Sequence, residues 1–435
     1  MDERCPRPME FGAAGPLRGR LGVPGDKSIS HRALMLAAMA RGRSVIHGLS
    51  GGSDVAATAA ALRAMGVRIQ AREGGWTVDG VGTGCLLQPG GALDMANSGT
   101  SARLLIGLLA SHPLIAGFTG DASLSRRPMA RVIEPLERLG ADIAAPARRL
   151  PLIVRGRCPA VPLTHRMVVP SAQVKSALLL AALNISGVTT IVEPVATRDH
   201  SERMLARFGA DISVEGPEIR LRGEAELKPC ALRVPGDPSA AAFLLVAALV
   251  VPGSEVTVEN VGTNVYRTGL FDLLREMGAD LSFANVHEEG GEPVADVTAR
   301  HSVLSGIDVP PDIAPRMIDE FPIFFVAAAF ARGATRTCGL GELRFKESDR
   351  LATMAAGLRA IGVRVEETTE GLTIEGSGGE PIAGGTSIPS RLDHRIAMSF
   401  AVAGLHARAP VTVDDMRPAD TSFPGFETLL RSLAP

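Results

Sequence analysis

The sequence predicts an α/β protein of two domains, each built from three copies of one repeat. Its 435 residues are too many for one ordinary hydrophobic core and favour two domains of about 200 residues each. A pattern of apolar helix, turn and β-branched strand recurs six times along the chain. The tetrapeptide Val-Pro-Gly-Asp occurs at 23–26 and again at 234–237, and three copies of the pattern lie between the two occurrences.

Each copy opens with an apolar helix. In the first copy we expect this helix to run from Lys27 to Arg41–Gly42 and to be followed by a strand over 44–47. The six opening helices are expected to begin near Lys27, Asn97, Ser171, Asp237, Asp319 and His394. The longest apolar run, 240–251, is too short to span a bilayer and predicts a buried helix.

A second helix in each copy ends in the pattern Leu-x-x-x-Gly. Glycine directly after a helix is a common C-cap, and the short β-branched segments that follow predict strands. The pattern occurs at 62–66, 136–140, 205–209, 274–278 and 358–362. These second helices are expected to open at Asp54, Arg126–Arg127, Arg198–His200, Arg267, Lys346–Arg350 and Thr421–Ser422. The repeating unit is therefore two helices on a small sheet.

We interpret the two Val-Pro-Gly-Asp segments as paired crossings between domains, which form a hinge at Val23–Asp26 and Val234–Asp237. The upper domain then spans 24–235, and the lower domain comprises 1–23 and 236–435. Two unrelated Pro-Gly turns are the alternative interpretation.

The composition excludes several function classes. A formal net charge of −2 argues against a nucleic-acid-binding protein, which normally carries a basic excess. The five cysteines show neither CxxC nor Cys/His ligand spacing, so they indicate reduced thiols and no zinc site. The first residues mix charges without an apolar segment, so we expect no secretion signal, no membrane partner and a cytoplasmic location.

The residues that open the predicted helices point to anionic ligands. A helix N-terminus offers free backbone N–H groups and the positive end of the helix dipole. Seven cations stand at such positions: Lys27, Arg32, Arg127, Arg198, Lys346, Arg350 and Arg395. If the helix starts converge on one cleft, anions must occupy it, and two polyanionic small substrates fit best. Taken singly, each residue is more simply a helix cap or a solvated surface residue.

Two carboxylates are candidates for acid–base chemistry. Glu347 follows Lys346, and Asp319 stands among apolar neighbours, where a carboxylate can accept or donate a proton near neutral pH. The alternative for Asp319 is a helix N-cap. Gly25-Asp26-Lys27-Ser28 lacks the glycine that a P-loop needs before its lysine. No GxSxG, HExxH, EF-hand or strand-linked GxGxxG motif is present, so no metal or dinucleotide site is expected.

Seven motifs together resemble the 5-enolpyruvylshikimate-3-phosphate (EPSP) synthase family of enolpyruvyl transferases. They occur in the family's order between about 24 and 424, at Pro24–Arg32, Asn97–Thr100, Leu124–Pro128, Pro170–Gln173, Thr197–His200, Lys346–Arg350 and Asp393–Arg395. The resemblance implies a two-domain inverted α/β barrel with three pseudo-symmetric βαβαββ units in each domain. It also implies that the 5-hydroxyl of shikimate 3-phosphate attacks C2 of phosphoenolpyruvate and that the adduct eliminates phosphate.

The resemblance assigns roles to residues at the motif positions. Shikimate 3-phosphate would contact Lys27, Ser28, Arg32, Ser171, Ala172, Gln173, Arg198, Asp319 and Lys346. Phosphoenolpyruvate would contact Lys27, Gly99, Arg127, Gln173, Arg350 and Arg395. Asp319 is the implied base on the 5-hydroxyl, while Glu347 and Lys27 exchange protons at the enol methylene. No metal or organic cofactor is implied, and we expect a monomer that serves aromatic amino acid biosynthesis.

Two positions separate this sequence from other members of the wider family. Thr421 and Ser422 precede Phe423, where part of the family has a lysine. Ala122 stands where the UDP-N-acetylglucosamine enolpyruvyl transferases have a reactive cysteine, which makes that reaction the weaker alternative. A non-catalytic anion-binding scaffold is a third reading, although all the implied acid–base residues are present. Gly99 leaves room beside phosphoenolpyruvate, so we expect inhibition by glyphosate, the family's inhibitor.

Overall fold

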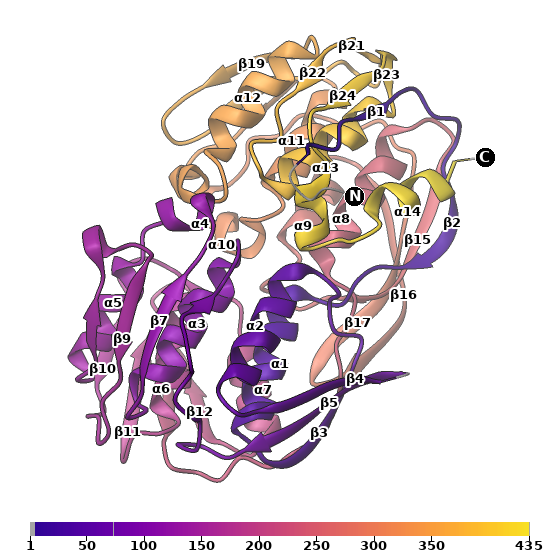
Figure 1. Cartoon of the computed structure of the whole chain (residues 1–435). Coiled ribbons are helices and arrows are strands. Elements are labelled where there is room, and N and C mark those ends of the chain that lie inside the picture. Colours follow the sequence, from indigo (N-terminus) through magenta and orange to yellow (C-terminus); the bar gives the residue numbers. More distant parts are fainter. Residues whose placement is uncertain (1–4, 73, 435) are drawn as a thin grey trace. The chain divides into compact units, whose positions relative to one another are not determined.

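The computed structural model describes residues 5–72 and 74–434. These residues form two compact units (Figure 1). Unit 1 consists of Met1–Pro24, Pro235–Glu288 and Pro293–Pro435, and unit 2 consists of Gly25–Val234 and Glu289–Glu292. Each unit encloses its own cluster of buried apolar side chains. No helix among the described residues is long and apolar enough to cross a membrane.

Unit 2 alternates helices and strands. Its helices are α1 (Lys27–Met39), α2 (Ser53–Ala64), α3 (Gly99–Ala110), α4 (Ala122–Arg126), α5 (Ala130–Arg138), α6 (Ala172–Ala182) and α7 (His200–Arg207). Its strands are β3 (Arg41–His47), β4 (Arg68–Arg72), β5 (Gly75–Val81), β6 (Leu93–Asp94), β7 (Ile115–Thr119), β8 (Asp142–Ala144), β9 (Leu152–Arg155), β10 (Thr164–Arg166), β11 (Val188–Val192), β12 (Asp211–Glu215), β13 (Glu218–Arg222) and β14 (Ala231–Arg233).

The described strands of unit 2 form three four-stranded sheets with one topology. Each sheet has a parallel pair followed by two antiparallel strands, in the orders β14-β3-β5-β4, β6-β7-β9-β8 and β10-β11-β13-β12. The last strand of the unit, β14, pairs with its first strand, β3, so the three copies close into a cycle. This confirms the predicted α/β repeat.

Unit 1 contains the other three copies. Its helices are α8 (Pro238–Val250), α9 (Gly269–Glu276), α10 (Ala314–Met317), α11 (Phe321–Phe330), α12 (Arg350–Ala360), α13 (His394–Gly404) and α14 (Phe426–Ser432). Its strands are β1 (Met9–Phe11), β2 (Arg18–Gly22), β15 (Glu255–Gly262), β16 (Asp280–Glu289), β17 (Glu292–Arg300), β18 (Ala334–Arg336), β19 (Arg364–Glu367), β20 (Leu372–Glu375), β21 (Ile382–Gly384), β22 (Ser387–Ile388), β23 (Ala407–Ala409) and β24 (Val411–Val413).

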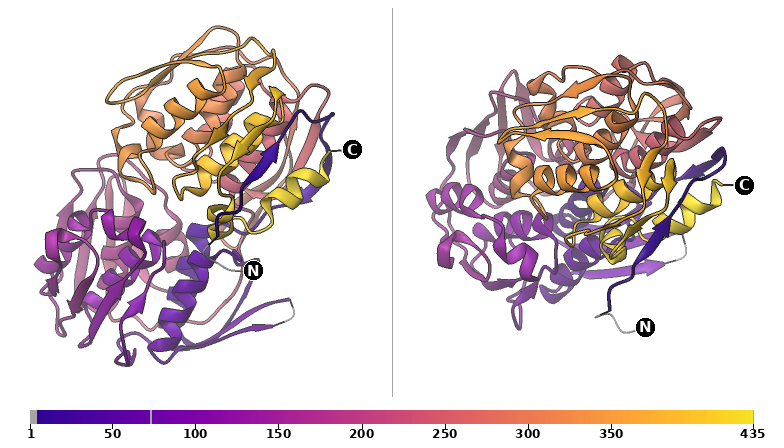
Figure 2. Two further views of the ribbon diagram at one scale, coloured as in Figure 1. Left: turned by 45° about the horizontal axis from the view of Figure 1, so that its top comes forward. Right: turned by 90° about the horizontal axis from the view of Figure 1, so that it is seen from above.

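The N-terminal segment completes two sheets of unit 1. Strand β2 pairs in parallel with β15 in the sheet β16-β17-β15-β2, and β1 pairs antiparallel with β24 in the sheet β1-β24-β22. Figure 2 shows this indigo segment running beside the yellow C-terminal segment. The remaining described strands form the sheets β18-β20-β19 and β21-β23. Residues from the two ends of the chain therefore share one core.

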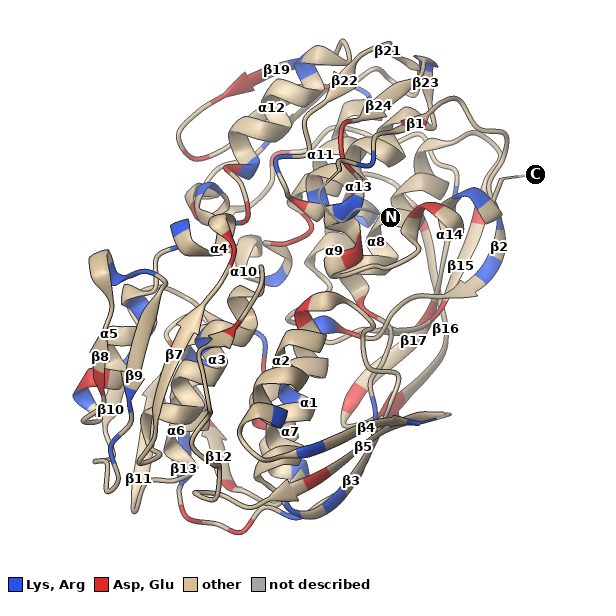
Figure 3. Cartoon of the chain, viewed as in Figure 1, with Lys and Arg blue, Asp and Glu red and all other residues tan. Residues whose placement is uncertain are grey.

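The first helix of each copy is an inner helix that is buried along most of its length. Every residue of α8 and of α11 is buried, and so is α1 from Ile29 onward. The apolar run 240–251 is thus the buried helix that the sequence predicts. Figure 3 shows charged residues at helix ends, in loops and on strands, while most helix turns are tan. The second helices bury one side only, as in α5 and α7.

The predicted glycine C-caps are confirmed. The glycines that follow α2, α5, α7, α9 and α12 all have positive φ, between 82° and 110°: Gly66, Gly140, Gly209, Gly278 and Gly362. After α2, the N–H of Val67 donates to the carbonyl of Leu62, and the N–H of Gly66 donates to the carbonyl of Arg63. This pair of hydrogen bonds satisfies two carbonyls that the helix leaves open.

Some predicted boundaries are wrong, and prolines account for three of them. Arg127 is extended because Pro128 follows it, so α4 ends at Arg126 and α5 starts at Ala130. Helix α11 begins at Phe321, with Pro322 in its first turn. Helix α14 begins after Pro424 and a left-handed Gly425. In the first copy the helix ends at Met39, two residues before the expected Arg41, where β3 starts.

A glycine at the end of a strand touches the C-terminus of the inner helix in four copies. A Cβ atom on Gly80, Gly156, Gly223 or Gly376 would overlap carbonyl oxygens from the last turn of α1, α3, α6 or α11. None of these glycines has positive φ. Close contact with backbone therefore excludes larger residues there.

We expect Gly156→Ala to lower the free energy of unfolding by about 1–3 kcal/mol. The added methyl group overlaps the carbonyl oxygens of Leu109 and His112, and backbone cannot rotate away as a side chain can. Urea denaturation compares this variant with Gly91→Ala, whose methyl group would meet no atom within 4 Å. Equal stability of the two variants would contradict the packing argument.

A buried histidine makes unit 2 sensitive to acid. His31 on α1 is 0% exposed, and its Nδ1 lies 2.7 Å from Thr58 Oγ1. Burial, assisted by the charges of Lys27 and Arg32, lowers the pKa of His31 well below its ordinary value of 6.5. The native state therefore holds the neutral ring at a pH where the unfolded chain already binds a proton.

The free energy of unfolding should consequently fall as the pH drops below about 6.5. In His31→Gln the free energy of unfolding should fall less steeply between pH 7 and pH 5 than in the wild type. The two slopes should differ by at most about 1.4 kcal/mol per pH unit. Urea denaturation at pH 5, 6 and 7 measures both slopes, with the exposed His287→Gln as control. A wild-type slope in His31→Gln would refute the assignment.

Candidate active site

Unit 2 links the N-termini of five helices by polar contacts. Lys27, the first residue of α1, forms an ion pair with Asp54 at the start of α2. The carbonyl of Asp54 accepts a hydrogen bond of 3.1 Å from Ser101 Oγ in the first turn of α3. Lys27 and Ser28 are both partly exposed at this end of α1.

The start of α3 is joined to the start of α6 through Gln173. Its amide nitrogen donates to Thr100 Oγ1 at 3.0 Å, and its amide oxygen accepts from Arg103 at 2.9 Å. Ser171 is the N-cap of α6, because its hydroxyl accepts from the N–H of Val174. Ser171, Ala172 and Gln173 thus form the first turn of one helix, as the motif predicts.

Arg32 joins α6 and α7 back to α1. Its guanidinium is buried and donates to Ser201 Oγ at 2.7 Å, Ser176 Oγ at 2.6 Å and the carbonyl of Ser28 at 2.8 Å. Ser201 Oγ also donates to Ser176 Oγ at 2.7 Å. The contacts therefore form a closed ring through α1, α2, α3, α6 and α7.

Arg127 lies beside Gly99. It donates to Asn97 Oδ1 at 2.6 Å, and Asn97 is held in turn by Asp121. A Cβ atom on Gly99 would lie 3.0 Å from Nη1 of Arg127 and 2.9 Å from Nη1 of Arg103. A side chain at position 99 would therefore shift one or both guanidinium groups that approach the first turn of α3.

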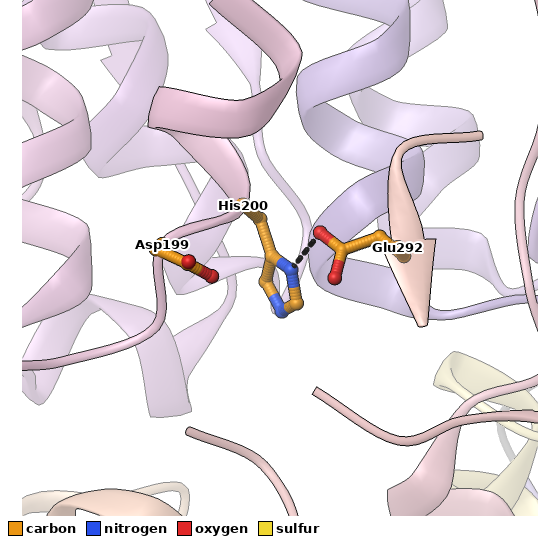
Figure 4. Close-up of side chains that lie close together, drawn as sticks. All are labelled: Asp199, His200 and Glu292. Atoms are coloured by element: carbon orange, nitrogen blue, oxygen red, sulfur yellow. Dashed lines mark hydrogen bonds and ion pairs between the residues drawn. The ribbon is translucent and has the colours of Figure 1, made fainter. Parts of the chain in front are cut away.

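Arg198 is partly exposed and lies between β11 and α7. Next to it, His200 Nδ1 and Glu292 Oε1 share a hydrogen bond of 2.6 Å, and Asp199 lies close to the ring (Figure 4). Among the described residues, Asp199, His200 and Glu292 are the group with metal-ligand chemistry. Asp199 already accepts from Arg203 at 2.8 Å and His200 is bonded to Glu292, so we assign this group no metal.

Arg350 is the centre of the corresponding set in unit 1. Its side chain is 1% exposed and donates to Asp393 at 2.9 Å and to Glu347 at 2.6 Å. Burial alone would lower the pKa of Arg350, but attraction to Asp393 and Glu347 outweighs burial and raises it. Asp393 also caps α13 and accepts from Ser348 Oγ at 3.0 Å. The guanidinium is therefore permanently charged and held by several acceptors.

Asp319 lies in the turn between α10 and α11. Its Oδ1 is 3.5 Å from both Lys346 Nζ and Arg350 Nη1, and its side chain is 20% exposed. The N-cap reading is wrong, since Glu320 occupies that position and makes no side-chain cap. The apolar neighbours Met317 and Phe321 are fully buried, while the carboxylate of Asp319 contacts two cations.

Arg395, in the first turn of α13, approaches Glu320 at 3.8 Å. Glu320 is buried and also accepts from Ser239 at the start of α8. Arg267, ahead of α9, donates to Ser239 Oγ at 2.8 Å and to Asp237 at 3.1 Å. The helix starts of unit 1 are therefore linked in the same manner as those of unit 2.

These contacts amend the charge argument made from the sequence. The cations Lys27, Lys346 and Arg350 have carboxylate partners inside their own unit. Those partners restrict the side-chain rotamers, and the helix N-termini add backbone N–H groups and a positive dipole end. The polar groups at the helix starts of each unit are therefore held in defined orientations.

Several residues of these sets have no substrate role in the resemblance, although the sequence already places Asp54 and Arg267 at helix starts. Their shared feature is a polar side chain at or near a helix start that contacts another helix start: Asp54, Arg103, Lys175, Ser176, Ser201, Arg267, Glu320 and Asp393. The signal in the sequence is their place at or near the helix starts of the repeat. Thr421, by contrast, lies in a 3₁₀ turn, and its hydroxyl donates to the carbonyl of Pro418 at 2.8 Å.

Comparison with known proteins agrees with this architecture. The model of the family described as EPSP synthase (3-phosphoshikimate 1-carboxyvinyltransferase) matches residues 12–430. A curated 3-phosphoshikimate 1-carboxyvinyltransferase of Sphingopyxis alaskensis is 61% identical over 444 residues, covering 100% of both chains. That of Novosphingobium aromaticivorans is 59% identical, covering 98% of this chain and 99% of its own.

Solved structures show the same fold. EPSP synthase from Acinetobacter baumannii has a TM-score of 0.87 and 43% sequence identity, with 98% of each chain covered. The enolpyruvyl transferase NikO from Streptomyces tendae has a TM-score of 0.76 at 18% identity, again with 98% of each chain covered, which extends the likeness in fold. The chain belongs to the EPSP synthase (3-phosphoshikimate 1-carboxyvinyltransferase) family.

Proposed function

We propose that this protein transfers the enolpyruvyl group of phosphoenolpyruvate to the 5-hydroxyl of shikimate 3-phosphate and releases phosphate. The observation that carries this proposal is the position of Asp319, whose carboxylate lies 3.5 Å from both Lys346 and Arg350. The two cations orient this carboxylate and attract anionic substrates, so the carboxylate is placed to accept a hydroxyl proton beside them. Membership in the family supports the choice of both substrates.

The residues of unit 2 are proposed to bind the substrates' anionic groups. Phosphate oxygens of shikimate 3-phosphate would accept hydrogen bonds from Ser28, Arg32, Ser171 and Arg198. Ala172 and Gln173 would line the acceptor site. Phosphoenolpyruvate would contact Arg127, Gln173 and the backbone at Gly99, and Lys27 would contact both substrates. Charge-assisted hydrogen bonds of this kind contribute roughly 1.5–3 kcal/mol each.

The residues of unit 1 are proposed to carry the proton transfers. Asp319 would accept the proton of the 5-hydroxyl, and Lys346 would bind the acceptor. Arg350 and Arg395 would hold phosphoenolpyruvate. Glu347, bonded to Arg350 at 2.6 Å, would exchange a proton with C3 of phosphoenolpyruvate together with Lys27.

The proposed reaction is balanced without a redox step. The 5-hydroxyl oxygen bonds to C2 of phosphoenolpyruvate while C3 gains a proton, which gives a tetrahedral adduct. The bond from C2 to the phosphate oxygen then breaks, and C3 loses a proton to restore the double bond. We propose that the protein works this way as a cytoplasmic monomer without a metal or organic cofactor, in aromatic amino acid biosynthesis.

Asp319→Asn should lower kcat about 10²–10⁴-fold, because the amide cannot accept the 5-hydroxyl proton. The assay measures phosphate released from phosphoenolpyruvate and shikimate 3-phosphate by the chelator-treated protein. Asp312→Asn, an exposed carboxylate in the same unit, should leave kcat unchanged. Phosphate release with UDP-N-acetylglucosamine as the acceptor would overturn the proposal. A lack of phosphate release with either acceptor would overturn it as well.

Gly99→Ala should raise the glyphosate concentration for half-inhibition about tenfold or more. The added methyl group lies 3.0 Å from Nη1 of Arg127 and must displace that guanidinium by some tenths of an ångström. The KM for phosphoenolpyruvate should rise as well, since the same arginine is proposed to bind it. Gly91→Ala controls for the added methyl group, and unchanged inhibition in Gly99→Ala would reject the steric explanation.

A further inference from the structure

Unit 2 contains a buried lysine on α6 that has no role in the proposed reaction. The side chain of Lys175, on α6, is 1% exposed. Its ammonium lies 2.9 Å from Glu193 Oε2 and 2.8 Å from Glu202 Oε1, and it donates to the carbonyl of Thr197 at 3.4 Å. Glu193 in turn accepts a hydrogen bond from the Thr197 hydroxyl.

The three groups form a charge cluster that stability alone does not explain. Glu193 and Glu202 are also buried, so one cation faces two carboxylates away from water. Burial raises the pKa of Glu202, and the nearby ammonium of Lys175 offsets this only in part. Buried ion pairs can often be replaced by apolar side chains without loss of stability, so stability alone is no sufficient reason for this cluster, and its place in the fold bears on its role.

The partners of Lys175 enclose one short segment. Glu193 follows β11, Glu202 lies in the first turn of α7, and Thr197 lies between them. Arg198 comes directly after Thr197. The carbonyl of Thr197 accepts a hydrogen bond from Lys175, and its hydroxyl donates to Glu193. Lys175 therefore ties the segment 193–202 to α6 on both sides of Arg198.

Helix α6 holds the other half of the arrangement. Ser171, its N-cap, and Gln173, in its first turn, precede Lys175 by four and two residues. Direct contacts between Lys175 and the segment 193–202 leave that segment little freedom to move along α6. The distance between the N-terminus of α6 and the backbone of Arg198 then depends on the ammonium together with the Arg32–Ser176–Ser201 hydrogen bonds that also join α6 and α7.

We propose that Lys175, Glu193 and Glu202 form a positioning cluster that sets Arg198 relative to Ser171 and thereby determines affinity for the phosphate group of the acceptor. The inference rests on the proposed function, because it takes Ser171 and Arg198 as contacts of that phosphate. Lys175 does not touch the substrate in this account. It acts through the segment that carries Arg198.

The test uses a charge-neutral variant of similar shape, Lys175→Met with Glu193→Gln and Glu202→Gln, which buries no unpaired charge. Calorimetry with shikimate 3-phosphate should show a Kd at least about tenfold higher than that of the wild type. The KM for phosphoenolpyruvate at saturating acceptor and the kcat should change less than about threefold. The control, Asp211→Asn with Arg222→Met, removes an exposed ion pair of the same unit and should leave the Kd unchanged.

Thr197→Val provides a second test that does not depend on the triple variant folding. It removes only the hydroxyl that bonds to Glu193 and should also raise the Kd for shikimate 3-phosphate. An unchanged Kd in a folded variant overturns the inference, as does an equal rise in the Kd and in the KM for phosphoenolpyruvate. A wild-type protein that binds shikimate 3-phosphate without releasing phosphate overturns the proposed function alone, while absence of binding overturns both.

Discussion

The backbone N–H groups at the start of the inner helices impose the main constraint on this structure. An inner helix such as α8 is buried along its whole length, so its first turn must find acceptors within the protein or on a ligand. Small polar caps such as Ser171 and Asp393 satisfy part of this need. The N–H groups and dipole that remain favour anions. Burial of the helices thus leads directly to polar N-termini of the kind that the proposed function requires.

Charged side chains at these helix starts are held by specific partners. Arg350 is almost fully buried, yet its position between Asp393 and Glu347 keeps it charged. Arg32 has its donors directed at hydroxyl and carbonyl oxygens of three helices. Such partners limit rotation of the side chains before a substrate arrives, which lowers the entropy lost on binding.

The repeated unit combines rigid packing with variable chemistry. Its sheet topology recurs in all three copies of unit 2, and equivalent glycines admit the end of an inner helix in several copies. The helix starts, in contrast, differ from copy to copy in their side chains. Lys27, Gln173 and Asp319 stand at related places in the repeat but have acquired different partners. One scaffold therefore presents several chemically distinct helix starts.

The sequence by itself determined the repeat, the type of each main element and the helix ends marked by glycine, because these depend on side chains within a few residues of one another. Gly66 and Gly362 end helices through local hydrogen bonds. Pro128 accounts for the break between α4 and α5. Many of the motif residues also lie at or next to helix starts, as the repeat predicts. Their roles toward substrates stay proposals.

Only the tertiary structure decided which charges are paired. The partners of Arg32 and Arg350 lie up to 169 and 43 residues away along the chain, and nothing local to either arginine indicates them. The same holds for Lys175, whose ammonium is an internal anchor although the sequence shows it as one more cation at a helix start. Strand β1 likewise finds β24 at the opposite end of the sequence. Long-range pairing depends on how the copies pack, and periodicity along one chain does not contain that information.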